Sequence, residues 1–138
     1  MSGEGGLHGS ARWHNKGRRI VYTATSTALA TLEIAVNLRT STLIPAYKVI
    51  EVDIPDDQVM KLTPIDLPPG WDETKAEPLV SRSVGDLWLT SKIALGLMVP
   101  SVVVPEHYNV LINPLHPEFG QIHYGDPMSF PFDPRIKR

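Results

Sequence analysis

The chain contains no cysteine, which excludes disulfide bonds, thiolate nucleophiles and cysteine-ligated metals. It also lacks an apolar run of the roughly 18–20 residues that a membrane-spanning helix needs, and it shows no signal peptide. The formal net charge is only −2, so no strong overall field would hold nucleic acid. These absences predict a cytoplasmic protein that binds neither membranes nor nucleic acid directly.

The composition that remains is that of one globular domain over residues 1–138. Its length is sufficient to bury a core, and 42% of its residues are hydrophobic against 20% charged. The 13 prolines argue against an all-helical bundle and favour many short elements joined by turns. Strands and helices mix without regular alternation, which favours the α+β class. Residues 1–9 are rich in glycine without periodicity and are predicted to be flexible.

The first clear elements are a strand followed by a helix. Residues 19–23 form a short β-rich run, and Ser26 is then a good helix N-cap, because its hydroxyl can accept from the free N–H groups of the first turn. Leu29, Leu32 and Val36 recur at helical spacing. They are predicted to form the buried stripe of this helix.

Later segments predict a mixed sheet and a second helix. The alternating residues 47–54 indicate a strand with one face made by Ile50, Val52 and Ile54. The other predicted segments are connections over 40–45 and 63–78, two short strands over 97–105 bent at Pro100, a strand over 108–113 and an edge strand within 128–136. The second helix is predicted to bury one face, formed by Val84, Leu87, Trp88 and Ser91.

Glu33 is the most unusual residue of the first helix. It lies four residues after Leu29 and three before Val36, on the stripe expected to be buried. A carboxylate there is costly unless a partner or a solvent-filled cleft receives it. Glu33 is therefore a candidate site residue, with a buried structural salt bridge as the alternative.

Three other residues are candidates, each with a structural alternative. Arg12 lies in a polar loop where its guanidinium and backbone groups could converge on an anion, unless it is an ordinary surface arginine. Tyr22 lies inside the strand before the helix, where a half-buried core tyrosine is equally natural. Ser101 follows Pro100 within an apolar run, and its alternative is a hydrogen-bonded structural serine.

No glycine, histidine or basic cluster indicates a cofactor or metal site. The glycines within residues 3–9 match neither a Walker loop nor a dinucleotide-binding turn. The five histidines lack metal-ligand spacing, so no metal is predicted. Lys16, Arg18 and Arg19 could hold a phosphate, although a solvated run of charges is the alternative.

Five motifs follow one another over nearly the whole chain, from Gly3 to about Arg135. They are Arg12-Trp13, Tyr22, Glu33, Val99-Pro100-Ser101 and Asn109-Val110-Leu111-Ile112-Asn113-Pro114-Leu115-His116-Pro117. In order and spacing they resemble the RES domain family. That family is named for an arginine, a glutamate and a serine, which correspond here to Arg12, Glu33 and Ser101.

The resemblance implies a fold similar to the ADP-ribosyltransferase toxins and a role as toxin of a bacterial type II toxin–antitoxin system. RES toxins deplete NAD by cleaving its nicotinamide–ribose bond, as NAD glycohydrolases or NAD phosphorylases. NAD would be the substrate, water or inorganic phosphate the acceptor, and no cofactor is expected. The implied partner is an Xre-like helix-turn-helix antitoxin that covers the active cleft, and the apolar strands are compatible with a homodimer.

The resemblance and the chemistry of the side chains together assign roles. Glu33 would stabilise the positive charge of an oxocarbenium-like transition state or grip a ribose hydroxyl. Arg12 would pair with the pyrophosphate, and Tyr22 would stack on the nicotinamide or ribose. Ser101 would bond the ribose or orient the acceptor. Asn113 and His116 would bind substrate at the rim of the cleft.

The chain departs from the family pattern at its beginning. The family usually starts with a further strand that carries a Tyr-Arg pair, whereas this sequence begins in the glycine-rich segment that follows. This departure keeps one alternative open, a truncated, catalytically silent module that only binds its antitoxin. Independently of it, the enzymatic alternative is an ADP-ribosyltransferase that modifies a protein acceptor instead of water or phosphate.

Overall fold

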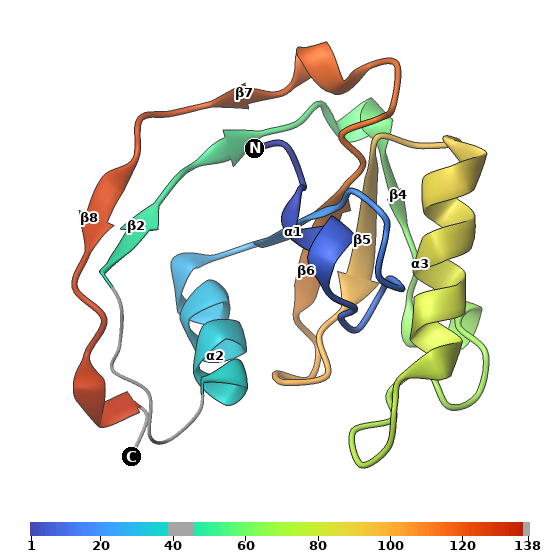
Figure 1. Cartoon of the computed structure of the whole chain (residues 1–138), viewed down its shortest axis with the longest axis horizontal. Helices are drawn as coiled ribbons and strands as arrows, with labels where there is room; N and C mark the ends of the chain where they lie inside the picture. Colours follow the sequence, from blue (N-terminus) through green and yellow to red (C-terminus); the bar gives the residue numbers. More distant parts are fainter. Residues whose placement is uncertain (39–45, 137–138) are drawn as a thin grey trace.

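A four-stranded sheet forms the centre of the computed structural model, which describes residues 1–38 and 46–136 (Figure 1). Its spatial order is β1 (Val21–Ala24), β6 (Tyr108–Ile112), β5 (Gly96–Pro100) and β4 (Val59–Lys61). The pairs β1–β6 and β6–β5 are antiparallel, and β5–β4 is parallel. The sheet is therefore mixed and mostly antiparallel, which confirms the predicted α+β class.

Two-stranded ladders form an arm outside this sheet (Figure 1). In the arm, β2 (Tyr47–Val49) pairs with β8 (Met128–Phe130), and β3 (Val52–Asp53) pairs with β7 (His123–Tyr124), both antiparallel. The 3₁₀ turns of the described chain are η1 (Asp56–Gln58), η2 (Pro64–Asp66), η3 (Phe119–Gln121) and η4 (Pro134–Ile136).

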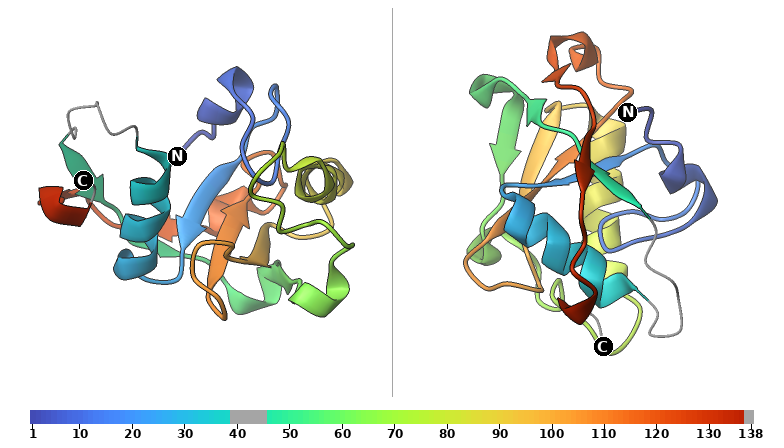
Figure 2. Two further views of the ribbon diagram at one scale, coloured as in Figure 1. Left: turned by 90° about the horizontal axis from the view of Figure 1, so that it is seen from below. Right: turned by 90° about the vertical axis from the view of Figure 1, so that its left-hand side faces the viewer.

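The described residues contain three α-helices, namely α1 (Gly5–His8), α2 (Thr27–Asn37) and α3 (Leu79–Ser91). The views in Figures 1 and 2 place α2 between the arm and the four-stranded sheet, with α3 on the far side of the sheet from the arm. No helix in these ranges is long and apolar enough to cross a lipid bilayer. The position of α2 matters because this helix carries Glu33.

The main core lies on one face of the sheet. Leu97 pairs with Leu111 and Val99 pairs with Asn109, so these four side chains share a face. Leu97, Val99 and Leu111 are fully buried and belong to a cluster that includes Trp13 and Trp88. Asn109 lies two residues before Leu111 on this face, so a polar side chain stands at the end of an otherwise apolar row.

The first helix begins as predicted but buries a different face. The hydroxyl of Ser26 accepts a hydrogen bond from the Leu29 amide at 3.1 Å, which confirms the N-cap. The predicted stripe is wrong: Leu29 is buried, but Leu32 and Val36 are 42% and 55% exposed. Apolar residues surround most of α2, so periodicity alone could not select the face that packs on the sheet.

Other predicted elements differ in detail. The strand over 47–54 is divided into β2 and β3, and residues 1–9 include the helical turn α1. Only one strand, β5, forms over 97–105, because after Pro100 the Ser101 amide bonds the His107 carbonyl at 2.8 Å and the chain turns. The sequence did not indicate β4.

The second helix and the last strands are closer to expectation. In α3, Trp88 is buried as predicted, but Leu87 is exposed. The strand over 108–113 is confirmed as β6. Strand β8 supplies the predicted strand within 128–136, and among the described strands it pairs with β2. The connection predicted over 40–45 lies outside the described residues.

Candidate active site

A cavity of about 780 Å³ is bounded by α2, the loop before β1 and the start of β6. It brings together Arg12 from that loop, Tyr22 from β1 and Glu33 from α2. Further polar side chains on its wall are Ser10, Thr23, Asn37, Tyr47, Arg82 and Asn109. Three of the four predicted catalytic residues thus share one cavity, although Glu33 lies 21 positions after Arg12 in the sequence.

Two neutral donors hold the Glu33 carboxylate. The Ser101 hydroxyl donates to Glu33 Oε1 at 2.7 Å, and the Asn109 side-chain amide donates to the same oxygen at 2.8 Å. Within the described chain, Glu33 makes no salt bridge. The structural ion pair considered as an alternative is therefore absent there, and the carboxylate is held without being neutralised by a cation.

Ser101 lies behind Glu33 rather than on the cavity wall. Its side chain is buried, and its oxygen accepts from the amides of Val103 at 3.0 Å and Val104 at 3.1 Å. The single hydroxyl proton is directed to Glu33, so both the donor and acceptor capacity of this group are in use. The structure therefore brings Ser101 to the site through its contact with Glu33.

The Tyr22 hydroxyl is held by the loop that carries Arg12. It accepts from the Trp13 amide at 3.1 Å and lies 2.8 Å from Nδ1 of buried His14. His14 Nε2 is 2.8 Å from the Gly9 carbonyl, which can only accept, so Nε2 carries a proton. In the neutral imidazole Nδ1 then accepts, and Tyr22 donates to it.

Although 41% of the Tyr22 surface is exposed, desolvation of its phenol raises the pKa well above the usual value, with the Trp13 amide bond opposing the shift and Asp86 adding to it. Because the folded-state pKa is the higher one, the stabilisation is complete below the unfolded pKa near 10 and is lost as pH rises further. We expect stability to fall more steeply above about pH 10 in the wild type than in Tyr22→Phe. Thermal melts from pH 8 to 12, with absorbance titration of the four tyrosines, measure the effect. Equal slopes of stability against pH in the wild type and Tyr22→Phe would contradict the expectation.

Arg12 is partly buried beside the carboxylate. Its Nη1 donates to the Trp71 carbonyl at 3.4 Å. Burial lowers the pKa of the guanidinium, and the negative charge of Glu33 opposes that shift. Since an arginine stays protonated, the cavity holds a positive and a negative group without a direct salt bridge between them.

Sequence reasoning did not name the further polar residues of the cavity as site residues, and Asn109 and Arg82 are the most informative of these omissions. Arg82 donates through Nε to the Ala11 carbonyl at 2.9 Å and pairs through Nη1 with Glu77 at 3.3 Å. Nothing in its helix pattern marked it. Asn109 could have been found, because it stands two residues before Leu111 on a face where alternation predicts an apolar residue.

Asn113 and His116 are not brought to this cavity. Asn113 is 1% exposed, and its amide donates to the Leu89 carbonyl at 3.0 Å while its oxygen accepts from the Leu115 amide at 3.1 Å. His116 accepts from the Glu118 amide through Nδ1 at 3.0 Å. Both side chains organise the turn after β6, and neither lines the cavity that contains Glu33.

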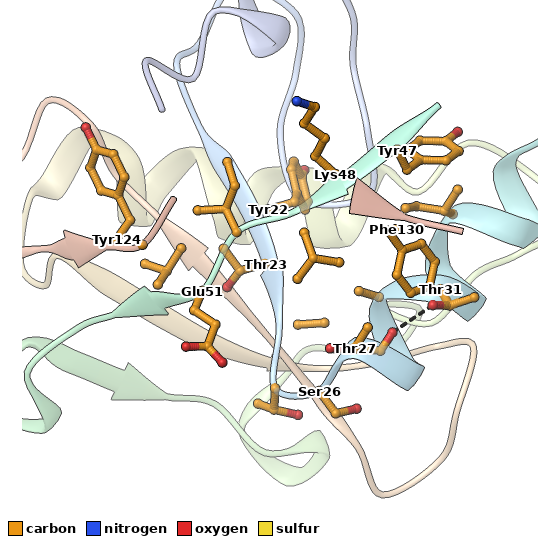
Figure 3. Close-up of a pocket in the computed structure, with 18 of the residues that line it drawn as sticks. Tyr22, Thr23, Ser26, Thr27, Thr31, Tyr47, Lys48, Glu51, Tyr124 and Phe130 are labelled. Atoms are coloured by element: carbon orange, nitrogen blue, oxygen red, sulfur yellow. Dashed lines mark hydrogen bonds between the residues drawn. The ribbon is translucent and has the colours of Figure 1, made fainter. Parts of the chain in front are cut away.

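A second cavity of about 830 Å³ adjoins the first, between β1, the beginning of α2 and the arm. Figure 3 shows Tyr22 and Thr23 facing it from one side and Tyr47 and Phe130 from the other. The two cavities share wall residues, which are Tyr22, Thr23, Ala24, Ala30, Ile34 and Tyr47. Within residues 1–38 and 46–136, no three acidic or histidine side chains converge where a metal ion could bind.

An α+β fold in which an arginine, a tyrosine and a serine-supported glutamate meet at one cavity is the arrangement expected of a RES domain. The RES domain family model matches residues 1–133, and the chain belongs to that family. The structure is similar to the M. tuberculosis MbcT–MbcA toxin–antitoxin complex, with a TM-score of 0.77 and 18% identity, over 94% of this chain and 76% of that one.

Curated relatives agree with this assignment. A protein of Yersinia enterocolitica named Toxin Res is 39% identical over 91% of this chain and 83% of its own length. A protein of Sphingobium sp. named Prs ADP-ribosylating toxin is 41% identical over 100% of this chain and 87% of its own length. The matched region of the Sphingobium protein spans this whole chain and so includes the positions of the cavity residues.

Proposed function

We propose that this chain is the toxin of a toxin–antitoxin system and that it depletes NAD by cleaving the nicotinamide–ribose bond. The observation that carries the proposal is the Glu33 carboxylate, which is held by Ser101 and Asn109 in a cavity that also contains Arg12 and Tyr22. The family membership and the relatives named as toxins support it. The relative named as an ADP-ribosylating toxin adds support, since NAD is the usual donor of ADP-ribose.

The reaction suits a fixed carboxylate. The bond between the ribose anomeric carbon and the nicotinamide nitrogen breaks, its electron pair goes to the nitrogen, and neutral nicotinamide leaves. Positive charge develops on the sugar, and Glu33 would stabilise that charge in a partly desolvated site. An oxygen of water or phosphate then bonds the anomeric carbon and releases its proton, which gives ADP-ribose or its 1″-phosphate.

The other residues would bind and orient the dinucleotide. Arg12 offers two parallel charged hydrogen bonds to the pyrophosphate. Tyr22 lies on the cavity wall with its hydroxyl held by Trp13 and His14, and its ring would stack on the nicotinamide or ribose. Ser101 would act through the Glu33 carboxylate to which it donates.

Replacing Arg12 with lysine is expected to raise KM for NAD by about 10-fold or more with a smaller change in kcat, because an ammonium makes no bidentate contact with a diphosphate. Initial rates of nicotinamide release measure both constants. Arg135→Lys is the matched control, since Arg135 is exposed and paired with Asp133. An unchanged KM in Arg12→Lys would remove Arg12 from pyrophosphate binding.

Product analysis tests the function and identifies the acceptor. The purified protein is incubated with NAD alone, with phosphate, and with cell extract as a source of protein acceptors. Free ADP-ribose would indicate hydrolysis, and ADP-ribose 1″-phosphate would indicate phosphorolysis. Protein that carries ADP-ribose would indicate a transferase. Absence of all three products from folded protein would overturn the proposal and favour a silent module.

The partner is proposed to be an Xre-like helix-turn-helix antitoxin. The supporting observation is that the similar structure is itself a toxin–antitoxin complex. Co-expression with an Xre-like gene found beside the gene for this chain should yield a complex that releases no nicotinamide from NAD. A complex that releases nicotinamide as fast as the free toxin would contradict the proposal that the antitoxin blocks the cavity.

A further inference from the structure

Asn109 and Ser101 donate to one and the same oxygen of Glu33. The distances to Oε1 are 2.8 Å from Asn109 Nδ2 and 2.7 Å from Ser101 Oγ. No side chain or amide of the described residues donates to the other oxygen, Oε2, although Glu33 lies on the cavity wall. The carboxylate is thus held from one side only.

The orientation of the Asn109 amide follows from the chemistry of its partner. A carboxylate can only accept, so Asn109 must present its NH₂ group to Glu33, and the opposite orientation would set two oxygens against each other. Asn109 itself is well fixed, because β6 is paired on both sides and Asn109 faces Ala24 of β1 and Val99 of β5. Its donor group therefore has a defined place before any substrate binds.

Two donors are needed because a glutamate carboxylate turns easily. The last torsion of the side chain joins an sp³ to an sp² carbon and has broad minima. One hydrogen bond to Oε1 leaves the carboxylate plane free to rotate about that contact. Two donors from different segments, the turn after β5 and the start of β6, define the plane and so the direction of Oε2.

We propose that Asn109 is a positioning residue that, together with Ser101, holds Glu33 Oε1 so that Oε2 is directed into the cavity toward the sugar of the substrate. The inference rests on the proposed NAD cleavage, and it adds a residue and an assignment of the two carboxylate oxygens. Asn109 acts through Glu33 and makes no essential contact with the dinucleotide.

Asn109→Ala is expected to lower kcat for nicotinamide release by about 10- to 100-fold and to leave KM for NAD within about threefold, because displacement of a reacting group affects the transition state more than ground-state binding. Asn109→Asp keeps the size of the side chain but removes the donor and sets a second carboxylate against Glu33. It should lower kcat at least as far. Asn15→Ala is the control, because that asparagine bonds Asp86 away from the cavity.

A double-mutant cycle separates positioning from a general structural effect. If Asn109 acts only through the carboxylate, Asn109→Ala should cause no further loss of activity in a Glu33→Gln protein. Full additivity, a rise in KM without a fall in kcat, or unchanged kinetics of both Asn109 variants would overturn the inference. Thermal melts verify that each variant is folded, and failure of both Asn109 variants to fold would make the residue structural. An inactive wild type would instead refute the proposed function, so the two failures are distinguishable.

Discussion

Glu33→Gln is expected to lower kcat for nicotinamide release by about 10³-fold, with KM for NAD changed by less than about threefold. Glutamine keeps the size of the side chain and can still accept from Ser101 and Asn109 through its oxygen. What it removes is the negative charge that should oppose the charge developing on the sugar. In the ground state the positive charge of NAD is on the nicotinamide nitrogen, and it develops on the sugar only as the bond breaks. The loss of activity should therefore fall on kcat.

Two comparisons make the Glu33 result specific. Glu118→Gln changes an exposed carboxylate outside the cavity and should retain full activity. Glu33→Asp keeps the charge but withdraws it by one methylene, and its activity should lie between those of wild type and Glu33→Gln. A Glu33→Gln protein that turned over NAD at the wild-type rate would show that the charge plays no part.

Gly85→Ala is expected to destabilise the fold by about 3 kcal/mol or more, since a methyl group would collide with fixed backbone. A Cβ on Gly85 would lie 1.7 Å from the carbonyl oxygen of Trp13. That loop is also bonded to α3 by the Ser81 hydroxyl, which donates to the Arg12 carbonyl at 2.6 Å. The collision would displace Arg12, so activity should fall together with stability.

Thermal and urea unfolding measure the effect of Gly85→Ala. Gly120→Ala is the matched control, because no atom lies within 4 Å of a Cβ at that position. We expect a decrease in Tm of roughly 10 °C for Gly85→Ala and little change for the control. Equal melting temperatures would mean that α3 and the Trp13 loop are less closely packed than the structure shows.

Local signals in the sequence were sufficient for several elements and for the main candidates. The Ser26 cap depends on a hydroxyl and the amide three residues later, and it forms as predicted. The strand 108–113 is apolar and stopped by Pro114, and it appears as β6. Glu33 stands out in the sequence because a carboxylate among apolar residues needs a partner, and in the structure its partners are Ser101 and Asn109.

Features that depend on distant segments could not be read from the sequence. Leu32 and Val36 have helical spacing with Leu29, but the face that α2 buries is decided by its packing on β1. The role of Asn109 depends on the alignment of β6 with β1 and β5, which places it opposite Ala24 and Val99. Asn113, in the same motif, instead supports the following turn.

The most direct test is nicotinamide release from NAD by the purified wild-type chain beside Glu33→Gln at equal concentration of folded protein. The account predicts multiple turnovers by the wild type and almost none by the variant. Equal release by both proteins, or no release by a folded wild type, would contradict it.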